Sequence, residues 1–280
     1  MNPAIEKLLD LAILEDAGSG DVTTEAVYSG SEKSTGLFLA KEDGIIAGSE
    51  LAGHIFKKID NSLIYEPLIS DGSEVKKGDE IARVSGSSGS ILTGERIALN
   101  FMQRMSGVAT VTRKFVDKVS HTKCRILDTR KTIPGHRYTD KWAVRLGGGY
   151  NHRYCLDDMY LIKENHIVVA GGIAEALDAC IQHKTQNEHE GHQVEIEVQN
   201  LDQINEVLDH GGADIIMLDN MDNETMKQAV ALCGGQVQLE ASGNMSLERV
   251  KNVAETGVDF ISVGALTHSV MAMDISLLFD

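Results

Sequence analysis

A cluster of basic residues stands out in an otherwise acidic chain. Between His121 and His166 there are nine Lys or Arg residues against five acidic residues. The whole chain has 26 Lys and Arg against 42 Asp and Glu, which gives a net charge of −16. Such a surface repels nucleic acid and anionic membranes, so neither is an expected partner. A basic segment in this setting indicates a small anionic ligand.

Polar and charged residues recur where the predicted strands of the second half end. Basic groups follow the first two of these strands, carboxylates the next two, and small residues the last two. In chain order they are Arg130, Lys131, Lys163, His166, Glu197, Asp219, Ser242, Gly243 and Gly264. Because an α/β barrel carries its chemistry at the carboxyl ends of its strands, these residues predict a cup with a cationic side and a carboxylate side.

The two sides of this cup suit different parts of a substrate. Arg binds a carboxylate or a phosphate through its planar fork, and Lys acts as a mobile point charge. Carboxylates suit ribose hydroxyls or a hard cation such as Mg²⁺. The small-residue turns Ala241–Asn244 and Val263–Leu266 enter predicted helices. Their backbone N–H groups could therefore hold a phosphate, assisted by His268.

The elements that must position these residues alternate between strand and helix. Strands are predicted at Arg125–Thr129, Asp158–Lys163, Gln193–Val198, Ala213–Leu218, Gln236–Ala241 and Val258–Val263. Segments with helical apolar spacing separate the later strands, with N-caps expected at Asn223 and Ser246. This alternation predicts a parallel sheet, either doubly wound or closed into a barrel. No G-x-G-x-x-G follows the first strand, which argues against a Rossmann dinucleotide site.

The first hundred residues predict a different, smaller domain. An amphipathic helix is expected at the N-terminus, followed by short strands at Leu37–Ala40, Gly44–Ala47, Ser62–Leu68 and Glu80–Ser85. A helix carrying Ile55, Phe56 and Ile59 interrupts the strands, and a long helix from Thr93 to Met105 follows them. We therefore expect an α+β domain over residues 1–105, with which the C-terminal tail can pack, and a catalytic α/β domain over residues 106–280.

Several other classes of protein do not fit this sequence. Its four cysteines stand far apart without a C-x-x-C motif, which predicts neither a disulfide scaffold nor a zinc knuckle and suits a reduced cytoplasm. No apolar run approaches the roughly 18–20 residues of a membrane span. His183, His189 and His192 lie in a polar, acid-rich stretch and are expected to be solvated rather than metal-binding.

Taken together, the motifs resemble those of quinolinate phosphoribosyltransferases. The most specific segments are DTRKTIPGHR at 128–137, AVRLGGGYNHR at 143–153 and LIKENHI at 161–167. Further agreement comes from EDAGSGDVTT at 15–24, GERIALNFMQRMSGVAT at 94–110, EIEVQN at 195–200, ADIIMLDNM at 213–221, EASGN at 240–244 and SVGALTHS at 262–269. The resemblance covers essentially the whole chain.

The resemblance implies a reaction and a set of site residues. In that family, quinolinate and phosphoribosyl pyrophosphate give nicotinate mononucleotide, pyrophosphate and CO₂ with Mg²⁺, a step of de novo NAD synthesis. Quinolinate would be bound by Arg96, Arg130, Lys131, His152, Arg153 and Lys163. Phosphoribosyl pyrophosphate would be bound by Lys131, Lys163, Glu197, Asp219, Ser242, Gly243, Gly264 and His268. The implied catalytic residues are Lys131, Lys163, Glu197 and Asp219, and Glu197 and Asp219 would hold Mg²⁺ directly or through water and substrate.

The resemblance also implies an architecture. It is the type II phosphoribosyltransferase fold, in which a smaller N-terminal α+β domain covers the mouth of a barrel-like parallel α/β domain. The expected assembly is a homodimer, or a higher oligomer, with composite active sites to which the partner subunit contributes its Arg96.

A few departures from the family pattern leave alternatives open. Leu146 and Cys155 replace smaller residues and bear on the packing of the glycine loop at 147–149, while Glu164 and Gln199 replace residues beside proposed ligands. A non-catalytic or repurposed homologue that binds an aromatic dicarboxylate is the main alternative. The others are a Schiff-base aldolase using Lys163 and a transferase acting on nicotinate without decarboxylation, which the surplus of cations disfavours.

Overall fold

The computed structural model describes residues 1–188 and 190–279, which form two compact units. The first unit comprises Met1–Arg113, Thr132–Gly148 and the residues from Leu266 on. The second comprises Lys114–Lys131 and Gly149–Ala265. In the described residues no helix is long and apolar enough to span a membrane.

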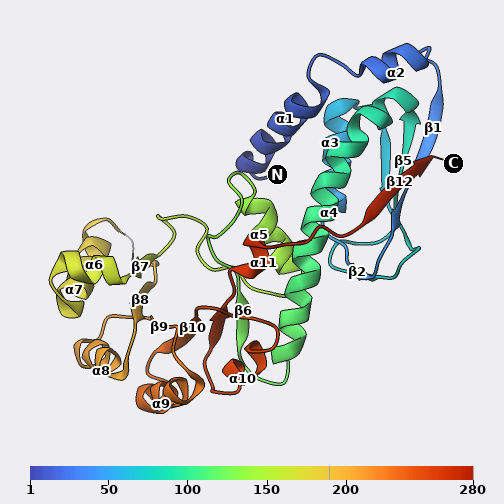
Figure 1. The fold of residues 1–280 in the computed structure, drawn as a ribbon. Coiled ribbons are helices and arrows are strands. Elements are labelled where there is room, and N and C mark those ends of the chain that lie inside the picture. The colour runs from blue at the N-terminus through green and yellow to red at the C-terminus, as the bar shows by residue number, and fades with distance from the viewer. Residues whose placement is uncertain (189, 280) are drawn as a thin grey trace. The chain divides into compact units, whose positions relative to one another are not determined.

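The first unit is built on an antiparallel sheet. Its order is β12 (Ile275–Phe279), β1 (Lys33–Ala40), β5 (Glu80–Ser87) and β3 (Ile64–Pro67), so the last strand of the chain pairs with the first (Figure 1). β2 (Gly44–Ile45) and β4 (Glu74–Val75) form a small separate ribbon. Helix α3 (Ser49–Ile59) packs on the sheet through Phe56, whose ring lies 6.0 Å from that of Phe38 and 5.9 Å from that of Tyr65.

The sequence predicted only some of the remaining helices of this unit, and one of them at a shorter length. The N-terminal helix is present as α1 (Pro3–Ala17), while α2 (Val22–Val27), α5 (Arg137–Leu146) and α11 (Ala265–His268) add to it. Helix α4 runs over Ser88–Val119, far beyond the predicted Thr93–Met105. The prediction was too short because the apolar spacing continues: Val108, Phe115 and Val119 are all buried along one face.

The second unit is a barrel-like parallel sheet with helices outside. Its strands are β6 (Arg125–Leu127), β7 (Tyr160–Ile162), β8 (Val194–Val198), β9 (Ile215–Asp219), β10 (Gln238–Ser242) and β11 (Phe260–Ser262). They run in the order β6-β11-β10-β9-β8-β7, with every pair parallel. Within the described residues the two edge strands, β6 and β7, do not pair, so the barrel is open between them. The predicted barrel-like α/β architecture with a smaller N-terminal domain is confirmed.

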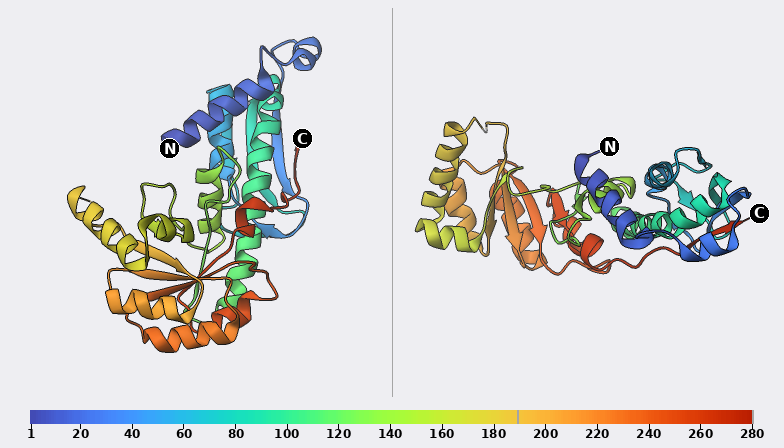
Figure 2. Two further views of the ribbon diagram at one scale, coloured as in Figure 1. Left: turned by 60° about the vertical axis from the view of Figure 1, so that its left-hand side comes forward. Right: turned by 90° about the horizontal axis from the view of Figure 1, so that it is seen from above.

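The helices of the second unit lie on the outer side of the strands (Figure 2). They are α6 (Glu164–Ala170), α7 (Ile173–Gln186), α8 (Leu201–His210), α9 (Asn223–Cys233) and α10 (Val250–Ala254). The predicted N-cap at Asn223 was wrong by one residue, because the Asp222 carboxylate accepts the Thr225 N–H at 2.8 Å. At Ser246 the hydroxyl accepts the Arg249 N–H at 3.3 Å across a turn, and the helix itself begins only at Val250.

A buried ion pair joins α4 to α5 inside the first unit. The Arg104 guanidinium donates from Nε to Asp140 Oδ1 at 2.9 Å and from Nη2 to Oδ2 at 2.8 Å. A third hydrogen bond runs from Nη2 to the Thr267 carbonyl at 3.1 Å. Asp140 is completely buried, so its charge is compensated chiefly by this arginine.

We expect Asp140→Ala to lower the free energy of unfolding by about 3–5 kcal/mol, because it leaves the Arg104 charge largely buried without its partner. The double variant Arg104→Met/Asp140→Leu should recover part of that loss, since it removes both charges together. Urea unfolding of the two variants and of the unmodified protein measures both effects. A loss below about 1 kcal/mol in Asp140→Ala would contradict the assignment, since that is the size typical of an exposed pair.

Candidate active site

A cavity of about 270 Å³ lies at the carboxyl ends of the barrel strands. It combines basic side chains with a few hydroxyls and apolar groups. The residues that line it are Thr129, Arg130, Lys131, His152, Arg153, Leu161, Lys163, Met217, Glu240, Ser242 and Ser262. The structure thus brings five of the six residues proposed for quinolinate around one cavity.

The alternation of side chains along each strand explains why these residues share the cavity. Successive residues of a strand point to opposite faces, so residues two apart point to the same face. Leu161 and Lys163 are such a pair at β7, and Glu240 and Ser242 are another at β10. Inward-facing positions of adjacent parallel strands therefore converge on the barrel axis.

Lys163 is fixed at both its backbone and its side chain. It follows β7 directly and forms the N-cap of α6, where its N–H donates to His166 Nδ1 at 2.9 Å. Its Nζ donates to Glu197 Oε2 at 2.6 Å. His166, which the sequence placed near the same strand end, thus orients the backbone of Lys163, while Glu197 compensates its charge.

A buried aspartate shapes the loop that carries His152 and Arg153. Asp128 is completely buried and follows β6 directly. Its carboxylate accepts from Asn151 Nδ2 at 2.6 Å and from the His152 N–H at 3.0 Å. Arg153 is held in turn through Nη1, which donates to the Met159 carbonyl at 3.2 Å. Burial, with the charge of nearby Arg130, lowers the pKa of the Arg153 guanidinium, so this cation is poorly solvated before any ligand arrives.

Two fully buried carboxyl groups lie beneath His152. His152 Nε2 is 2.9 Å from Glu195 Oε2 and 3.5 Å from Glu240 Oε2. Burial raises the pKa of Glu195 to about 7 and that of Glu240 to about 8, and the charge of Glu195 adds to the rise at Glu240. The pair therefore retains protons near neutral pH that exposed glutamates have lost.

These three residues could also be considered as metal ligands, since their donor atoms lie within 4.8 Å of one another. The hydrogen bonding of His152 indicates that its Nε2 carries a proton rather than a metal ion. His152 Nδ1 accepts the Arg153 N–H at 2.8 Å, which leaves the ring proton on Nε2, the atom that faces the carboxyl groups. A metal ion would need that nitrogen without its proton.

The other proposed site residues are placed differently. Glu197 lies in β8 beside Lys163, and Asp219 ends β9 in register with Ser242 of β10. Gly243 and Gly264 follow β10 and β11, so all four stand at the same end of the barrel without lining the cavity. Arg96 lies exposed on α4 and His268 on α11, and both belong to the first unit.

The glycine loop at 147–149 and the described histidines of the acid-rich stretch lie outside the cavity. Gly147 lies so close to α4 that a Cβ there would approach the Ala109 carbonyl to 2.5 Å, which only glycine permits. His183 Nδ1 lies 2.9 Å from the Tyr160 hydroxyl, and His192 Nε2 lies 3.0 Å from the Asp157 carbonyl. His189 lies outside the described residues.

The sequence reasoning missed Asp128, Glu195 and Glu240. A usable signal existed for two of them, because Glu195 precedes Glu197 by two positions and Glu240 precedes Ser242 by two positions. The period of two in a strand places each pair on one face, so tracing it back from the strand ends would have found both glutamates.

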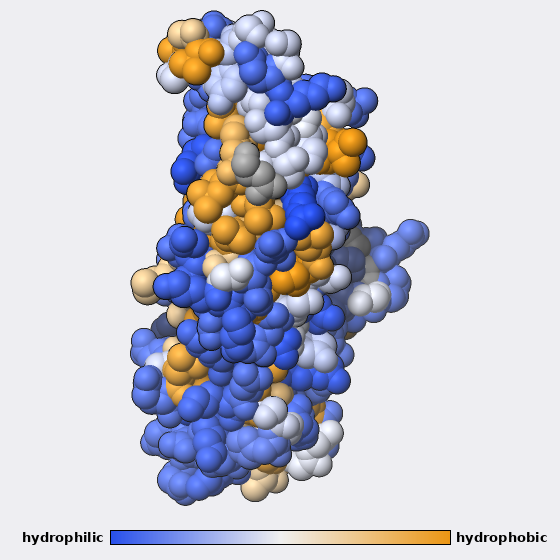
Figure 3. Space-filling model, turned by 90° about the vertical axis from the view of Figure 1, so that its right-hand side faces the viewer, coloured by the Kyte–Doolittle hydropathy of each residue, from blue (hydrophilic) through white to orange (hydrophobic). Residues whose placement is uncertain are grey.

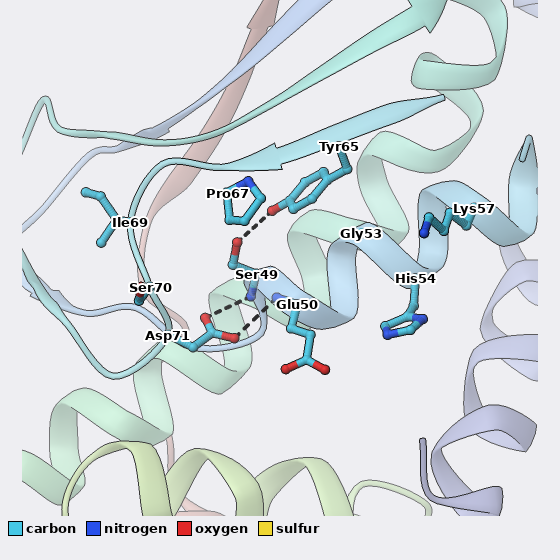
Figure 4. Close-up of a pocket in the computed structure, with 10 residues that line it drawn as sticks. All are labelled: Ser49, Glu50, Gly53, His54, Lys57, Tyr65, Pro67, Ile69, Ser70 and Asp71. Carbon is cyan, nitrogen blue, oxygen red and sulfur yellow. Dashed lines mark hydrogen bonds between the residues drawn. The ribbon is translucent and has the colours of Figure 1, made fainter. Parts of the chain in front are cut away.

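A larger cavity of about 440 Å³ lies in the first unit, beside α3 (Figure 4). Three of its polar side chains, those of Ser49, Tyr65 and Asp71, have partners within the cavity wall. Asp71 accepts the Ser49 and Glu50 N–H groups at 3.0 and 3.2 Å, and the hydroxyls of Ser49 and Tyr65 lie 2.8 Å apart. Asp71 thus caps α3, and none of the residues proposed from the sequence lines this cavity.

An α/β barrel with a cationic cavity at its strand ends is the architecture of an enzyme that binds small anions. The chain matches the family models described as quinolinate phosphoribosyl transferase, N-terminal domain, over residues 21–106 and C-terminal domain over residues 108–278. The chain belongs to the quinolinate phosphoribosyltransferase family.

Relatives and solved structures agree over the full length. The chain is 47% identical to a mitochondrial quinolinate phosphoribosyltransferase [decarboxylating] 2b of Nicotiana tabacum, over 99% of this chain and 82% of that protein. It is 40% identical to a probable nicotinate-nucleotide pyrophosphorylase [carboxylating] of Bacillus subtilis, over 98% and 92%. The structure of the nicotinate-nucleotide pyrophosphorylase from Francisella tularensis superposes with a TM-score of 0.93 at 42% identity, covering 100% of this chain and 97% of that one.

The acid pair predicts a specific dependence of stability on pH. The pKa values of Glu195 and Glu240 are raised to about 7 and about 8 from an ordinary 4.5. The folded protein therefore keeps a proton that the unfolded chain releases above about pH 4.5, and stability falls as the pH rises from there to about 8. Glu240→Gln removes one ionising group and keeps a hydrogen-bond donor, so its Tm relative to the unmodified protein should be higher at pH 8 than at pH 6.

Thermal unfolding at several pH values measures this difference, and each unit of pKa shift removed is equivalent to about 1.4 kcal/mol. Glu206→Gln, on the exposed side of α8, is the matched control and should follow the unmodified protein at every pH. A constant Tm difference between Glu240→Gln and the unmodified protein from pH 6 to pH 8 would show that the pair does not titrate in this range.

Proposed function

We propose that this protein transfers phosphoribosyl from phosphoribosyl pyrophosphate to quinolinate with decarboxylation, giving nicotinate mononucleotide, pyrophosphate and CO₂. The observation that carries the proposal is the gathering of Arg130, Lys131, Arg153 and Lys163, with His152, around one small cavity. A chain with a net charge of −16 has little reason to gather these groups unless they bind an anion. The number of cations suits a ring with two carboxylates.

The proposed chemistry follows from the position of these charges. The pyridine nitrogen attacks the anomeric carbon of the ribose as pyrophosphate leaves, which makes the nitrogen cationic. When the carboxylate beside the nitrogen departs as CO₂, its electron pair stays on the ring carbon, where the adjacent cationic nitrogen stabilises it until the carbon takes a proton from water. Lys131 and Lys163 stabilise the negative charge that develops at that carbon, while Arg130 and Arg153 orient the carboxylates. Fixed positive charge and orientation thus supply most of the acceleration.

The carboxylate side of the site fits Mg²⁺ and a ribose. Glu197 and Asp219 offer oxygen donors at the ends of the adjacent strands β8 and β9. Such hard donors suit Mg²⁺, which retains several waters and uses few protein ligands. The ion would neutralise charge on the departing pyrophosphate. Ser242, Gly243, Gly264 and His268 would hold the phosphates.

We further propose a homodimer in which the partner subunit contributes Arg96. Large apolar side chains are exposed on both units, and these support an interface with a second copy. On α1 and α2 they are Leu11, Leu14, Val22 and Val27, and near β7 and α6 they are Leu156, Val168 and Val169. Figure 3 shows one face of the molecule, on which hydrophobic patches interrupt a mainly hydrophilic surface.

A cytoplasmic location stays a prediction. It rests on the four dispersed cysteines, none of which is in a disulfide in the described structure. The plant relatives include proteins named as mitochondrial or chloroplastic, so the family occurs in more than one compartment.

An assay with the purified protein, quinolinate, phosphoribosyl pyrophosphate and Mg²⁺ tests the function. We expect equal amounts of CO₂ and nicotinate mononucleotide, no product with nicotinate in place of quinolinate, and loss of activity when EDTA removes the divalent ion. Restoring Mg²⁺ should restore the rate. Quinolinate binding without turnover would instead identify a repurposed homologue that binds an aromatic dicarboxylate.

Two substitutions separate binding from catalysis. Arg153→Ala should weaken quinolinate binding about 10- to 150-fold, which is the loss of a charged hydrogen-bonding group worth about 1.5–3 kcal/mol. Lys163→Ala should lower kcat by about 100-fold or more, because its charge is needed most as the carbanion forms. Steady-state kinetics and calorimetric titration with quinolinate measure both. Lys227→Ala, whose Nζ pairs with Glu224 on exposed α9, is the control and should leave both values unchanged.

The assignment of the two residues would be wrong if Lys163→Ala kept a near-normal kcat, or if Arg153→Ala bound quinolinate as tightly as the unmodified protein. A trapped imine after borohydride reduction with a carbonyl substrate would point instead to Schiff-base chemistry at Lys163.

A further inference from the structure

Arg249 ties together two loops that stand at the carboxyl end of the barrel. It is the N-cap residue of α10, and its guanidinium reaches the loops after β9 and β10. Nη1 donates to the Gly243 carbonyl, in the loop after β10, at 2.9 Å. Nη2 donates to the Met221 carbonyl, in the loop after β9, at 2.9 Å. One planar fork therefore fixes the distance between the two loops.

Both loops have backbone conformations that need such support. Asn220 has a φ of 54° and Asn244 a φ of 47°, and Gly243 between β10 and Asn244 has a φ of 98°. Of the three non-glycine residues with positive φ in the described residues, two are these asparagines. The left-handed region is unfavourable for residues with a Cβ and persists only where surrounding contacts enforce it.

A chain of amide contacts links these strained positions to Asp219. Asn244 Nδ2 donates to Asn220 Oδ1 at 3.2 Å, and Asn220 Nδ2 donates to Asp219 Oδ2 at 3.0 Å. The Asn220 N–H also donates to the Ser242 carbonyl at 3.0 Å. The loops approach so closely that a Cβ on Gly243 would overlap the Asn220 amide oxygen. A change in the spacing of the two loops would therefore move the Asp219 carboxylate.

The directions of the Gly243 and Met221 carbonyl groups indicate how the Arg249 guanidinium affects the neighbouring backbone N–H groups. In a planar trans peptide the C=O and the following N–H point in opposite directions. Holding the Gly243 carbonyl toward Arg249 turns the Asn244 N–H away from Arg249, and holding the Met221 carbonyl does the same for the Asp222 N–H. Turns that present backbone N–H groups in this way form concavities for anions.

We propose that Arg249 is a positioning residue for the phosphoribosyl donor. It keeps the loop after β9, with Asp219, and the loop after β10, with Ser242 and Gly243, at the spacing and peptide orientation that the phosphates of the donor require. Without the fork, the Gly243 peptide can rotate and present its carbonyl oxygen to a phosphate, which repels it. This inference rests on the proposed function and adds a residue that does not itself touch the substrates.

The test compares Arg249→Met, Arg249→Lys and the unmodified protein in the complete reaction with Mg²⁺. Arg249→Met should raise the KM for phosphoribosyl pyrophosphate about tenfold or more, as expected for the loss of charge-assisted hydrogen bonds. Calorimetric titration with quinolinate alone should give a Kd within about twofold of the unmodified protein. Arg249→Lys keeps the charge without the fork, so it should recover only part of the affinity for the donor.

Lys251→Met is the matched control, because Lys251 lies exposed in α10 and its Nζ is 3.8 Å from Glu255 Oε1. It should leave both constants unchanged. Should Arg249→Met fail to fold, Asn220→Gly serves as the second variant: glycine adopts the same φ but lacks the amide, so it too should raise the KM for the donor selectively.

The outcomes are distinguishable. An unchanged KM for phosphoribosyl pyrophosphate in Arg249→Met, in a protein whose unmodified form is active, would overturn the positioning role while leaving the proposed function intact. Equal weakening toward both substrates with a lower Tm would also overturn it, because it would assign Arg249 to general stability. If the unmodified protein neither bound nor consumed the donor, the proposed function would fail, and the role of Arg249 would fail with it.

Discussion

The rest of the site depends on one constraint, which is that the carboxyl ends of all six parallel strands lie at the same end of the barrel. Six strands run in the same direction around the barrel, so residues far apart in the sequence meet at one end. The period of two along each strand then decides which side chains face the axis. Lys163, Glu197, Asp219 and Ser242 come from four different strands or the positions that directly follow them, yet no long loop is needed to bring them together. Changing the register of any strand by one residue would remove its functional group from this end.

Charge compensation is the second requirement, and it explains the acidic residues around the cavity. Cations gathered in a small space repel one another and lose solvation unless acids face them. Glu197 faces Lys163, the Glu195 and Glu240 carboxyl groups with their raised pKa values lie near His152, and Asp128 holds the backbone of the same loop. The pair is suited to this position, because its raised pKa values leave it less than fully ionised near neutral pH beside the imidazole. A full charge on both glutamates would cancel much of the positive potential that an anionic ligand needs.

Much of this arrangement could be predicted from the sequence, and the reasons for the misses are physical. The barrel strands were located because apolar runs and strand-end polar residues recur at a regular spacing, and the strand ends pointed to Lys163 and Glu197. Glu195 and Glu240 were missed because a buried acidic residue inside an apolar run is rare, and what accommodates these two, their raised pKa values and the nearby His152, is set by tertiary structure. The extension of α4 was missed although its apolar spacing continues beyond Met105, whereas the pairing of β12 with β1 depends on tertiary packing that no local pattern specifies. Arg249 was missed for the same reason, since its partners are backbone carbonyls, which carry no side-chain signature.

The two halves of the proposed site differ in how they are held, and this difference has a consequence for catalysis. Lys163 directly follows a strand, and the loop with His152 and Arg153 is fixed by a buried carboxylate, so this side is formed before any ligand binds. The side proposed for the phosphates consists of short loops in strained conformations, held by hydrogen bonds from one arginine and two asparagines. A strained backbone conformation persists only while the contacts that enforce it remain. A ligand that adds contacts to these loops therefore stabilises further the conformation that they already have. A preformed cationic cavity beside loops whose conformation is already held by hydrogen bonds is well suited to a reaction in which one substrate must stay still while the other loses its leaving group.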